Sequence, residues 1–217
     1  MKIGITSRIT NENPHNEIRD ALSHDWFEYF NKIMPKAILI PIPNNHNNIK
    51  KWLEVLDLDL VILSNGNDIG EYVIRDDTEN SVISFAVEAC IPIIGFCRGF
   101  QLINIYFGGE LTLNIIDTHE EKHINVDHQL IISDQAFIDL IGTRKIEVNS
   151  FHSHGIAYKD LASSLKIFAS TEGGLVEGFI HNDLPIIGIQ WHPERNNNAS
   201  EENKIIINEF INNGKFW

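Results

Sequence analysis

The stretch "IIGFCRGFQL", residues 93–102, joins an apolar run to a segment with helical spacing, and it holds a cysteine between two glycines. The apolar run is typical of a strand that is buried on both faces of a parallel sheet. Gly95 and Gly99 stand two positions either side of Cys97, and such glycines permit the sharp strand-to-helix turn that presents a nucleophile. The first amides of the helix would favour the reactive thiolate, and Arg98 would add positive charge nearby. The pattern alone leaves two interpretations open: a catalytic cysteine, or an ordinary turn with a buried thiol.

Short apolar runs rich in β-branched residues alternate with stretches of helical spacing along the first half of the chain. This order predicts an α/β fold with an open, mostly parallel central sheet and helices on both faces, of the flavodoxin-like kind. Cys90 ends the third helical stretch, and we expect it to be buried in the core. The expected strands lie at 2–6, 37–43, 59–64 and 91–96, and the expected helix faces comprise Ile18, Leu22, Trp26, Tyr29, Phe30 and Ile33, then Ile49, Leu53 and Leu56, then Val82, Phe85, Ala86 and Ala89.

The second half of the chain reads as a series of strands. The runs at 123–133 and 143–155 have no long helix between them, and two further runs flank Gly173 and Gly174, which predict a hairpin turn. We therefore expect extra antiparallel strands here, with 185–190 returning to the central sheet. A last helical stretch closes the chain. Because no linker or internal repeat is visible, the sequence predicts a single domain over residues 1–217.

Composition narrows the class of protein. The chain has 217 residues, 43% of them hydrophobic and 22% charged, as in an ordinary globular protein. A formal charge of −13 argues against partners that need a basic face, namely nucleic acids and anionic membranes. No window resembles a signal peptide or a membrane span, so we expect a cytoplasmic protein. In that reducing compartment Cys90 and Cys97 would be free thiols.

A nucleophile needs a base, and "GIQWHPER" supplies His192 and Glu194. Residues two apart in an extended segment point to the same side, so the carboxylate can orient the imidazole. A surface His-Glu pair is the alternative interpretation. The loop "LSNGNDIG" follows the third strand at the carboxyl edge of the sheet, where open α/β folds place their sites. The amides of Gly66 and Arg98 could together form an oxyanion hole, although the loop could also be a plain connection.

The ordered motifs Gly-x-Cys-x-Gly-x-Gln, "NSFHSHG" and "WHPE" resemble the class I glutamine amidotransferase family, in particular its γ-glutamyl hydrolase branch. The resemblance covers essentially the whole chain. It implies that Cys97 is the nucleophile, His192 the general base and acid, and Glu194 the residue that orients the imidazole. It also implies that the glutamyl group is held by Gly66, Gln101, Ser150, Phe151 and His152.

The chain departs from the family pattern at the oxyanion loop, where the usual Gly-Gly reads Asn65-Gly66. Asparagine tolerates left-handed backbone angles better than other non-glycine residues, so we expect the hole to be retained. The N-terminal segments are similar to those of amidohydrolases of bacterial capsule phosphoramidate pathways, which cleave γ-glutamyl-CDP-amidate to glutamate and cytidine diphosphoramidate. An anionic pyrophosphate needs arginines, and Arg8 and Arg19 lie in this region, where solvated surface charge is the other interpretation.

These observations favour hydrolysis of a γ-glutamyl amide through a thioester, with a small-molecule substrate and no cofactor or metal. The sequence leaves the leaving group and the oligomeric state open, a homodimer included. The sequence leaves four other interpretations: a glutaminase subunit that delivers ammonia to a separate synthetase, an α/β-hydrolase, a zinc site, and an inactive binding module. The α/β-hydrolase places its acid before the histidine, unlike Glu194. The zinc site would use His119, His123 and His128.

Overall fold

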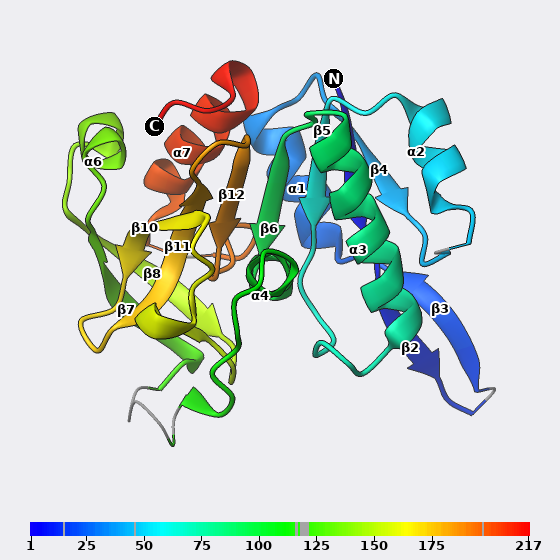
Figure 1. The fold of residues 1–217 in the computed structure, drawn as a ribbon, viewed down its shortest axis with the longest axis horizontal. Coiled ribbons are helices and arrows are strands. Elements are labelled where there is room, and N and C mark those ends of the chain that lie inside the picture. The colour runs from blue at the N-terminus through cyan, green and yellow to red at the C-terminus, as the bar shows by residue number, and fades with distance from the viewer. Residues whose placement is uncertain (15, 46, 116, 118–121, 197) are drawn as a thin grey trace.

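A twisted sheet of ten strands runs through the computed structural model, which describes residues 1–14, 16–45, 47–115, 117, 122–196 and 198–217 (Figure 1). Its strand order is β4-β1-β5-β6-β12-β11-β10-β7-β8, and β9 pairs with β11. The strands are β1 (Lys2–Thr6), β4 (Ile38–Ile42), β5 (Leu60–Leu63), β6 (Ile93–Phe96), β7 (Ile124–Ile132), β8 (Lys145–Phe151), β9 (Ile156–Ala157), β10 (Leu165–Ser170), β11 (Leu175–His181) and β12 (Ile186–Ile189).

The sheet is parallel in its first half and antiparallel in its second, as the sequence predicts. Strands β4, β1, β5, β6 and β12 run parallel, and the pairs formed by β11, β10, β7 and β8 are antiparallel. The hairpin turn between β10 and β11 contains Gly174 with a φ of 91°. In register, Gly95 of β6 lies opposite Leu63 on one side and Gly188 on the other. The segments that follow β5, β6 and β12 therefore leave the sheet side by side.

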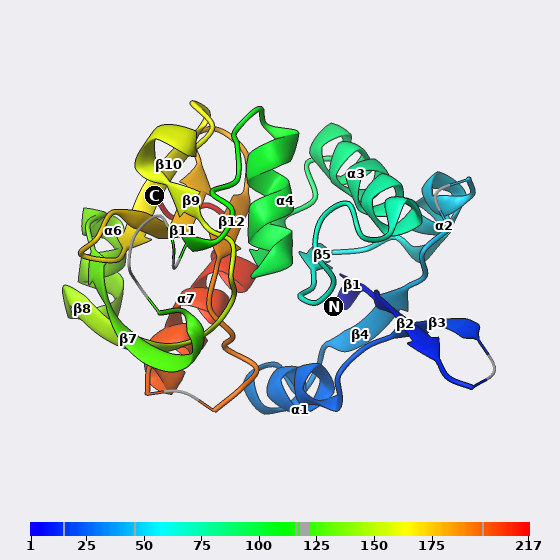
Figure 2. The same cartoon turned by 90° about the horizontal axis from the view of Figure 1, so that it is seen from below.

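Helices cover both faces of the sheet (Figure 2). One core cluster packs α1, α6 and α7 against one face, and the other packs α2, α3 and α4 against the opposite face. Among the described residues, no helix combines the length and apolarity needed to cross a bilayer. The helices are α1 (His24–Ile33), α2 (Ile49–Leu56), α3 (Val73–Glu88), α4 (Arg98–Tyr106), α6 (Gln135–Ile141) and α7 (Ser200–Asn213), with a single 3₁₀ turn at Tyr158–Asp160.

The helix expected from Ile18 onward begins later. Strands β2 (Arg8–Glu12) and β3 (Glu17–Ala21) pair as a separate antiparallel ribbon, and Ile18 on it is 57% exposed. Helix α1 starts at His24, after Ser23, whose hydroxyl caps it. The helical spacing from Trp26 onward is confirmed, since Trp26 and Phe30 are buried, but Ile18 has no core surface to pack against.

The expectation that Cys90 is a core thiol is wrong. Helix α3 ends at Glu88, and Cys90 lies beyond its cap with a left-handed φ of 54° and an exposed side chain. The helical periodicity therefore stops before this residue, and its position in the turn points the thiol to solvent.

The turn at Cys97 depends on close backbone packing on both sides. A Cβ at Gly99 would lie 2.2 Å from the carbonyl oxygen of Leu63, and one at Gly95 would lie 2.6 Å from the carbonyl carbon of Gly99. Neither contact can be relieved by a rotamer change, because the atoms that would clash belong to the backbone. Both positions therefore require glycine, which confirms why these residues flank Cys97.

We expect Gly99→Ala to destabilise the protein by about 3 kcal/mol, although alanine is otherwise the better helix former. The new methyl group would push α4 away from β5 and misplace the turn. Thermal or urea unfolding measures the loss. Ile105→Ala, on an exposed position of the same helix, is the matched control and should cost far less. Equal stability of the two variants would contradict the close packing described here.

Candidate active site

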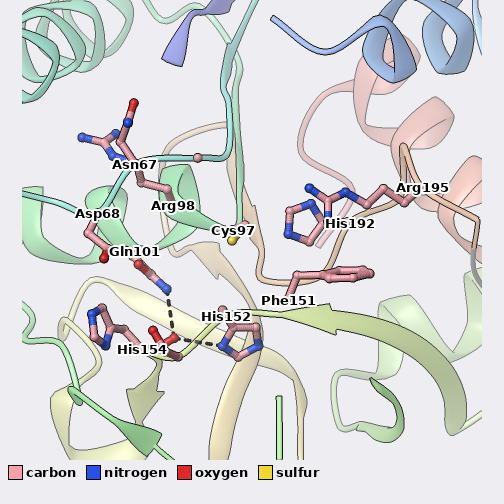
Figure 3. A pocket seen from close by; sticks show the side chains of 12 residues that line it. Asn67, Asp68, Cys97, Arg98, Gln101, Phe151, His152, His154, His192 and Arg195 are labelled. Atoms are coloured by element: carbon pink, nitrogen blue, oxygen red, sulfur yellow. Dashed lines mark hydrogen bonds between the residues drawn. The ribbon is translucent and has the colours of Figure 1, made fainter. Parts of the chain in front are cut away.

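The Cys97 side chain opens into a cavity of about 200 Å³ at the carboxyl edge of the parallel strands (Figure 3). Its backbone is strained, with φ 50° and ψ −100°, and its N–H donates to the carbonyl oxygen of Ile189 at 2.8 Å. Cys97 thus sits at the N-terminus of α4, as the turn motif predicts. The cavity is lined by Gly66, Asn67, Asp68, Cys97, Arg98, Gln101, Phe151, His152, Ser153, His154, His192 and Arg195.

His192 faces the sulfur from the segment that follows β12. It lines the cavity together with Cys97, the two side chains interact electrostatically, and Nδ1 of His192 lies 2.8 Å from Oε1 of Glu194. The Asn149 side chain holds the backbone of His192 from both sides, since its Nδ2 donates to the His192 carbonyl and its Oδ1 accepts from the His192 N–H, each at 2.9 Å. The structure therefore brings together the three residues expected to form a triad.

The side chain of Asn65 also contacts this pair. Its Nδ2 lies 2.7 Å from Oε1 of Glu194 and 2.9 Å from Nδ1 of His192. Asn65 does not use the left-handed backbone tolerance expected of it, because the left-handed residues of this loop are Gly66, Asn67 and Gly70, with φ of 81°, 54° and 92°. Asn65 instead fits through its side chain.

The charges of Cys97 and His192 depend on each other. Burial disfavours the thiolate, but the imidazole groups of His192 and His152 outweigh it and lower the pKa of Cys97. Burial likewise disfavours the imidazolium, but Cys97 and Glu194 outweigh it and raise the pKa of His192 to about 9. The arrangement therefore favours a thiolate-imidazolium pair near neutral pH, the form in which a cysteine is nucleophilic.

The loop after β5 is anchored from behind by the buried guanidinium of Arg75. This group donates to the carbonyl oxygens of Ser64 at 3.2 Å, Asn65 at 3.0 Å and Gly66. In a trans peptide the N–H points away from the carbonyl of the same unit, so fixing the Asn65 carbonyl turns the Gly66 N–H away from Arg75. An amide turned in this way is what an oxyanion hole requires.

Arg98 does not place its charge beside the sulfur, contrary to expectation. Its guanidinium is buried in ion pairs with Asp76 and Glu79 of α3, and Glu79 also pairs with Arg75 at 3.2 Å. The side chain leads away from Cys97 in Figure 3. Two carboxylates on the neighbouring helix, of which Glu79 is fully buried and Asp76 partly buried, therefore hold the arginine in place of the thiolate.

The residues expected to hold the glutamyl group are only partly gathered. Gln101, Phe151 and His152 line the cavity, and the Gln101 amide donates to the His154 carbonyl at 3.0 Å. Ser150 is fully buried and turned the other way, with its hydroxyl donating to the His123 carbonyl at 2.7 Å. Alternate side chains of β8 point to opposite sides, which separates Ser150 from its neighbours.

The arginines expected near the substrate lie in different places. Arg8 packs beside Gly66: a Cβ added at Gly66 would lie 3.1 Å from the Cδ of Arg8. Arg19 lies on the exposed hairpin and pairs with Glu17 at 2.8 Å. Arg195, which the sequence analysis did not single out, lines the cavity with its Cζ 4.4 Å from the centre of the Phe151 ring. Its place directly after Glu194 was a signal that could have identified it.

A second group of imidazoles surrounds the buried carboxylate of Glu177. The Glu177 oxygens lie 3.4 Å from Nε2 of His152, 3.7 Å from Nδ1 of His123 and 3.8 Å from Nε2 of His128. His152 donates Nδ1–H to the His154 carbonyl at 2.9 Å, which turns Nε2 toward Glu177. His123, His152 and Glu177 could hold a metal ion by their spacing. His119, which belonged to the zinc interpretation, lies outside the described residues.

Comparison with known proteins identifies the family of the chain. The sequence profile of the Peptidase C26 family matches residues 2–194. The chain belongs to this family of class I glutamine amidotransferase-like proteins. It is 34% identical over 203 residues to the γ-glutamyl-CDP-amidate hydrolase of Campylobacter jejuni, covering 91% of this chain and 92% of that protein.

Two further relatives extend the comparison. A Schizosaccharomyces pombe protein named as a glutamine amidotransferase is 37% identical over 152 residues; the match takes in 66% of this chain but spans only 59% of that protein's length. The glutaminase domain of Trypanosoma brucei CTPS shares the fold, with a TM-score of 0.71 over 100% of this chain and 95% of that one at 13% identity.

Prediction of a low thiol pKa can be checked by alkylation, in a Cys90→Ser background because Cys90 is exposed. We expect Cys97 to react with iodoacetamide readily at pH 7, because its lowered pKa keeps the thiolate present at a pH where an ordinary thiol is protonated. His192→Gln removes the imidazolium and leaves burial, which raises the thiol pKa, so the rate should fall by about tenfold or more. His24→Gln, at an exposed histidine, is the control. An unchanged rate in His192→Gln would contradict the ion pair.

Proposed function

We propose that this protein hydrolyses a γ-glutamyl amide through a thioester on Cys97. The observation that carries the proposal is the alignment of Cys97, His192 and Glu194 at one end of the cavity, with Nδ1 of His192 2.8 Å from Glu194. Membership of the Peptidase C26 family supports the reaction class. The cavity of about 200 Å³ suits an acyl group the size of an amino acid.

The first half of the reaction forms the thioester. The Cys97 thiolate attacks the γ-carbonyl carbon, and the electron pair of the carbonyl moves to oxygen, where the amides of Gly66 and Arg98 stabilise it. The imidazolium of His192 then gives its Nε2 proton to the departing nitrogen, and the carbon–nitrogen bond breaks. Glu194 holds Nδ1–H throughout, so Nε2 stays directed at the sulfur.

The second half releases glutamate. His192, now neutral, takes a proton from water as the oxygen attacks the thioester carbonyl. The tetrahedral intermediate collapses by breaking the carbon–sulfur bond, and the thiolate is restored beside the reprotonated imidazole. Gln101, Phe151 and His152 would contact the glutamyl group on the side of the cavity away from His192.

For the leaving group we propose cytidine diphosphoramidate, so that γ-glutamyl-CDP-amidate is the substrate. The support is the 34% identity to the Campylobacter jejuni hydrolase across nearly both chains. Arg195 lines the cavity and Arg8 packs beside the lining residue Gly66, so both cations could contact a pyrophosphate that extends from the cavity. Arg19, on the outer hairpin, would reach it only if the substrate extended beyond Arg8.

The second candidate is a glutaminase subunit that delivers ammonia to a synthetase. We retain this candidate because the chain shares its fold with the glutaminase domain of CTPS. The two functions differ in what leaves with the nitrogen, so they are separable by substrate.

Glutamate release from γ-glutamyl-CDP-amidate, from simple γ-glutamyl amides and from glutamine tests the proposal directly. We expect the protein alone to hydrolyse the first of these, and Cys97→Ala to lower kcat by about 10⁴-fold or more while the protein stays folded. Cys90→Ala should keep full activity. Turnover of glutamine alone, and only with a partner protein present, would favour the glutaminase subunit.

Arg195→Gln tests the leaving group. Loss of the cation should raise KM for γ-glutamyl-CDP-amidate by about tenfold, an interaction of roughly 1.4 kcal/mol, and leave uncharged γ-glutamyl amides nearly unchanged. Arg144→Gln is the charge-matched control, because Arg144 is an exposed residue directly before β8. If both substrates lost activity equally, Arg195 would act on the triad and not on an anionic leaving group.

A further inference from the structure

We infer that the side chain of Asn65 is a positioning residue for the His192-Glu194 pair, which it holds in register with Cys97 from the other side of the nucleophile strand. The inference rests on the proposed function, because it assigns Asn65 a part in that reaction. It goes beyond the oxyanion hole, which uses the backbone of this loop and needs no side chain at this position.

Asn65 and the His192-Glu194 pair follow strands that are not neighbours in the sheet. Asn65 follows β5, and His192 and Glu194 follow β12, while β6 with Cys97 lies between these two strands. The contact of Asn65 with Glu194 therefore passes over the end of the nucleophile strand. Asn65 is 9% exposed, and the Glu194 side chain is 1% exposed, so water competes little for this bond.

The chemistry of the contact defines which way the amide points. Nδ2 lies 2.7 Å from Oε1 of Glu194, and the reverse orientation would set two oxygens at that distance. Oε1 therefore accepts from Asn65 and from Nδ1–H of His192 together. Nδ2 also lies 2.9 Å from Nδ1, but both atoms are donors in this tautomer, so they converge on the one oxygen and make no hydrogen bond with each other.

The hydrogen bond from Asn65 to Glu194 also affects the pKa of His192. A neutral donor on the carboxylate stabilises its negative charge and weakens its hold on the imidazolium. Loss of the Asn65 amide should make Glu194 more basic, tighten the proton on His192 and make the imidazolium a poorer acid toward the leaving nitrogen. Both the position and the acidity of His192 would change in the same variant.

Other charged and titratable groups face His192 and stay in place when Asn65 is replaced. Cys97 lies across the cavity, His152 lies beyond it, and Nε of Arg195 is 3.6 Å from Oε1 of Glu194. Tyr29 of α1 also interacts electrostatically with Glu194. These groups contribute equally before and after the substitution, so a change in the titration of His192 reports the loss of Asn65.

The test compares Asn65→Ala with Asn67→Ala. Asn67 belongs to the same loop and ties it to Ile9 and Arg75, but it makes none of the contacts with Glu194 and His192 described here. The titration of His192 is followed by NMR of protein labelled with ¹⁵N-histidine, with the signal assigned by its absence from His192→Gln. Asn65→Gly is the second variant, for use if the alanine variant does not fold.

We expect the midpoint of His192 to move up by about half a pH unit or more in Asn65→Ala and to stay in place in Asn67→Ala. Where a substrate is turned over, kcat should fall by about ten- to a hundredfold in Asn65→Ala with little change in KM. An unmoved midpoint, or an equal shift in both variants, would overturn the positioning role. Because the titration needs no substrate, its outcome is independent of whether the proposed reaction is correct.

Discussion

The backbone of Cys97 is the constraint on which the rest of the site depends. A non-glycine residue at φ 50° and ψ −100° costs about 1–3 kcal/mol and persists only where the surroundings over-determine it. Here the surroundings are Gly99 against the Leu63 carbonyl, Gly95 against Gly99, and the hydrogen bond from Cys97 to Ile189. These contacts join three adjacent strands, so the geometry of the turn and the register of the sheet are set together. The same register places the loops after β5 and β12 on either side of the sulfur.

Buried charge supports this arrangement from behind. Arg75 and Arg98 pair with Glu79 and Asp76, so two cations and two carboxylates lie together beneath the loop after β5. Removing one member would leave an uncompensated charge, which is far more costly than the net gain from the intact pairs. The main effect of the network is therefore to fix the loop geometry. Arg75 binds the carbonyl oxygens of Ser64, Asn65 and Gly66, so the Gly66 N–H points away from Arg75.

Sequence reasoning succeeded where the signal was local. The glycines at 95 and 99, the spacing of His192 and Glu194 and the apolar runs of the parallel strands could be recognised within a few residues of chain. It failed where the partner is distant in sequence. Ile18 has helical spacing with Trp26 but joins a hairpin outside the core, and Arg98 turns from the sulfur to carboxylates of another helix. Asn149 opens the "NSFHSHG" motif, but nothing in that motif predicts its hydrogen bonds to His192 across 43 residues of chain.

Two imidazole-carboxylate pairs act on the Cys97 sulfur, His192 with Glu194 and His152 with Glu177, and they differ in their chemical roles. His192 must lose and regain a proton in each proposed cycle, so it cannot supply constant positive charge. His152 takes no part in those transfers; burial of its ring is outweighed by Glu177, which raises the pKa of His152, and His152 in turn lowers the pKa of Cys97. The donation of its Nδ1–H to the His154 carbonyl keeps its other nitrogen on Glu177. The thiolate that leaves the acyl group therefore returns to a site where an imidazole outside the proposed proton transfers lowers its pKa.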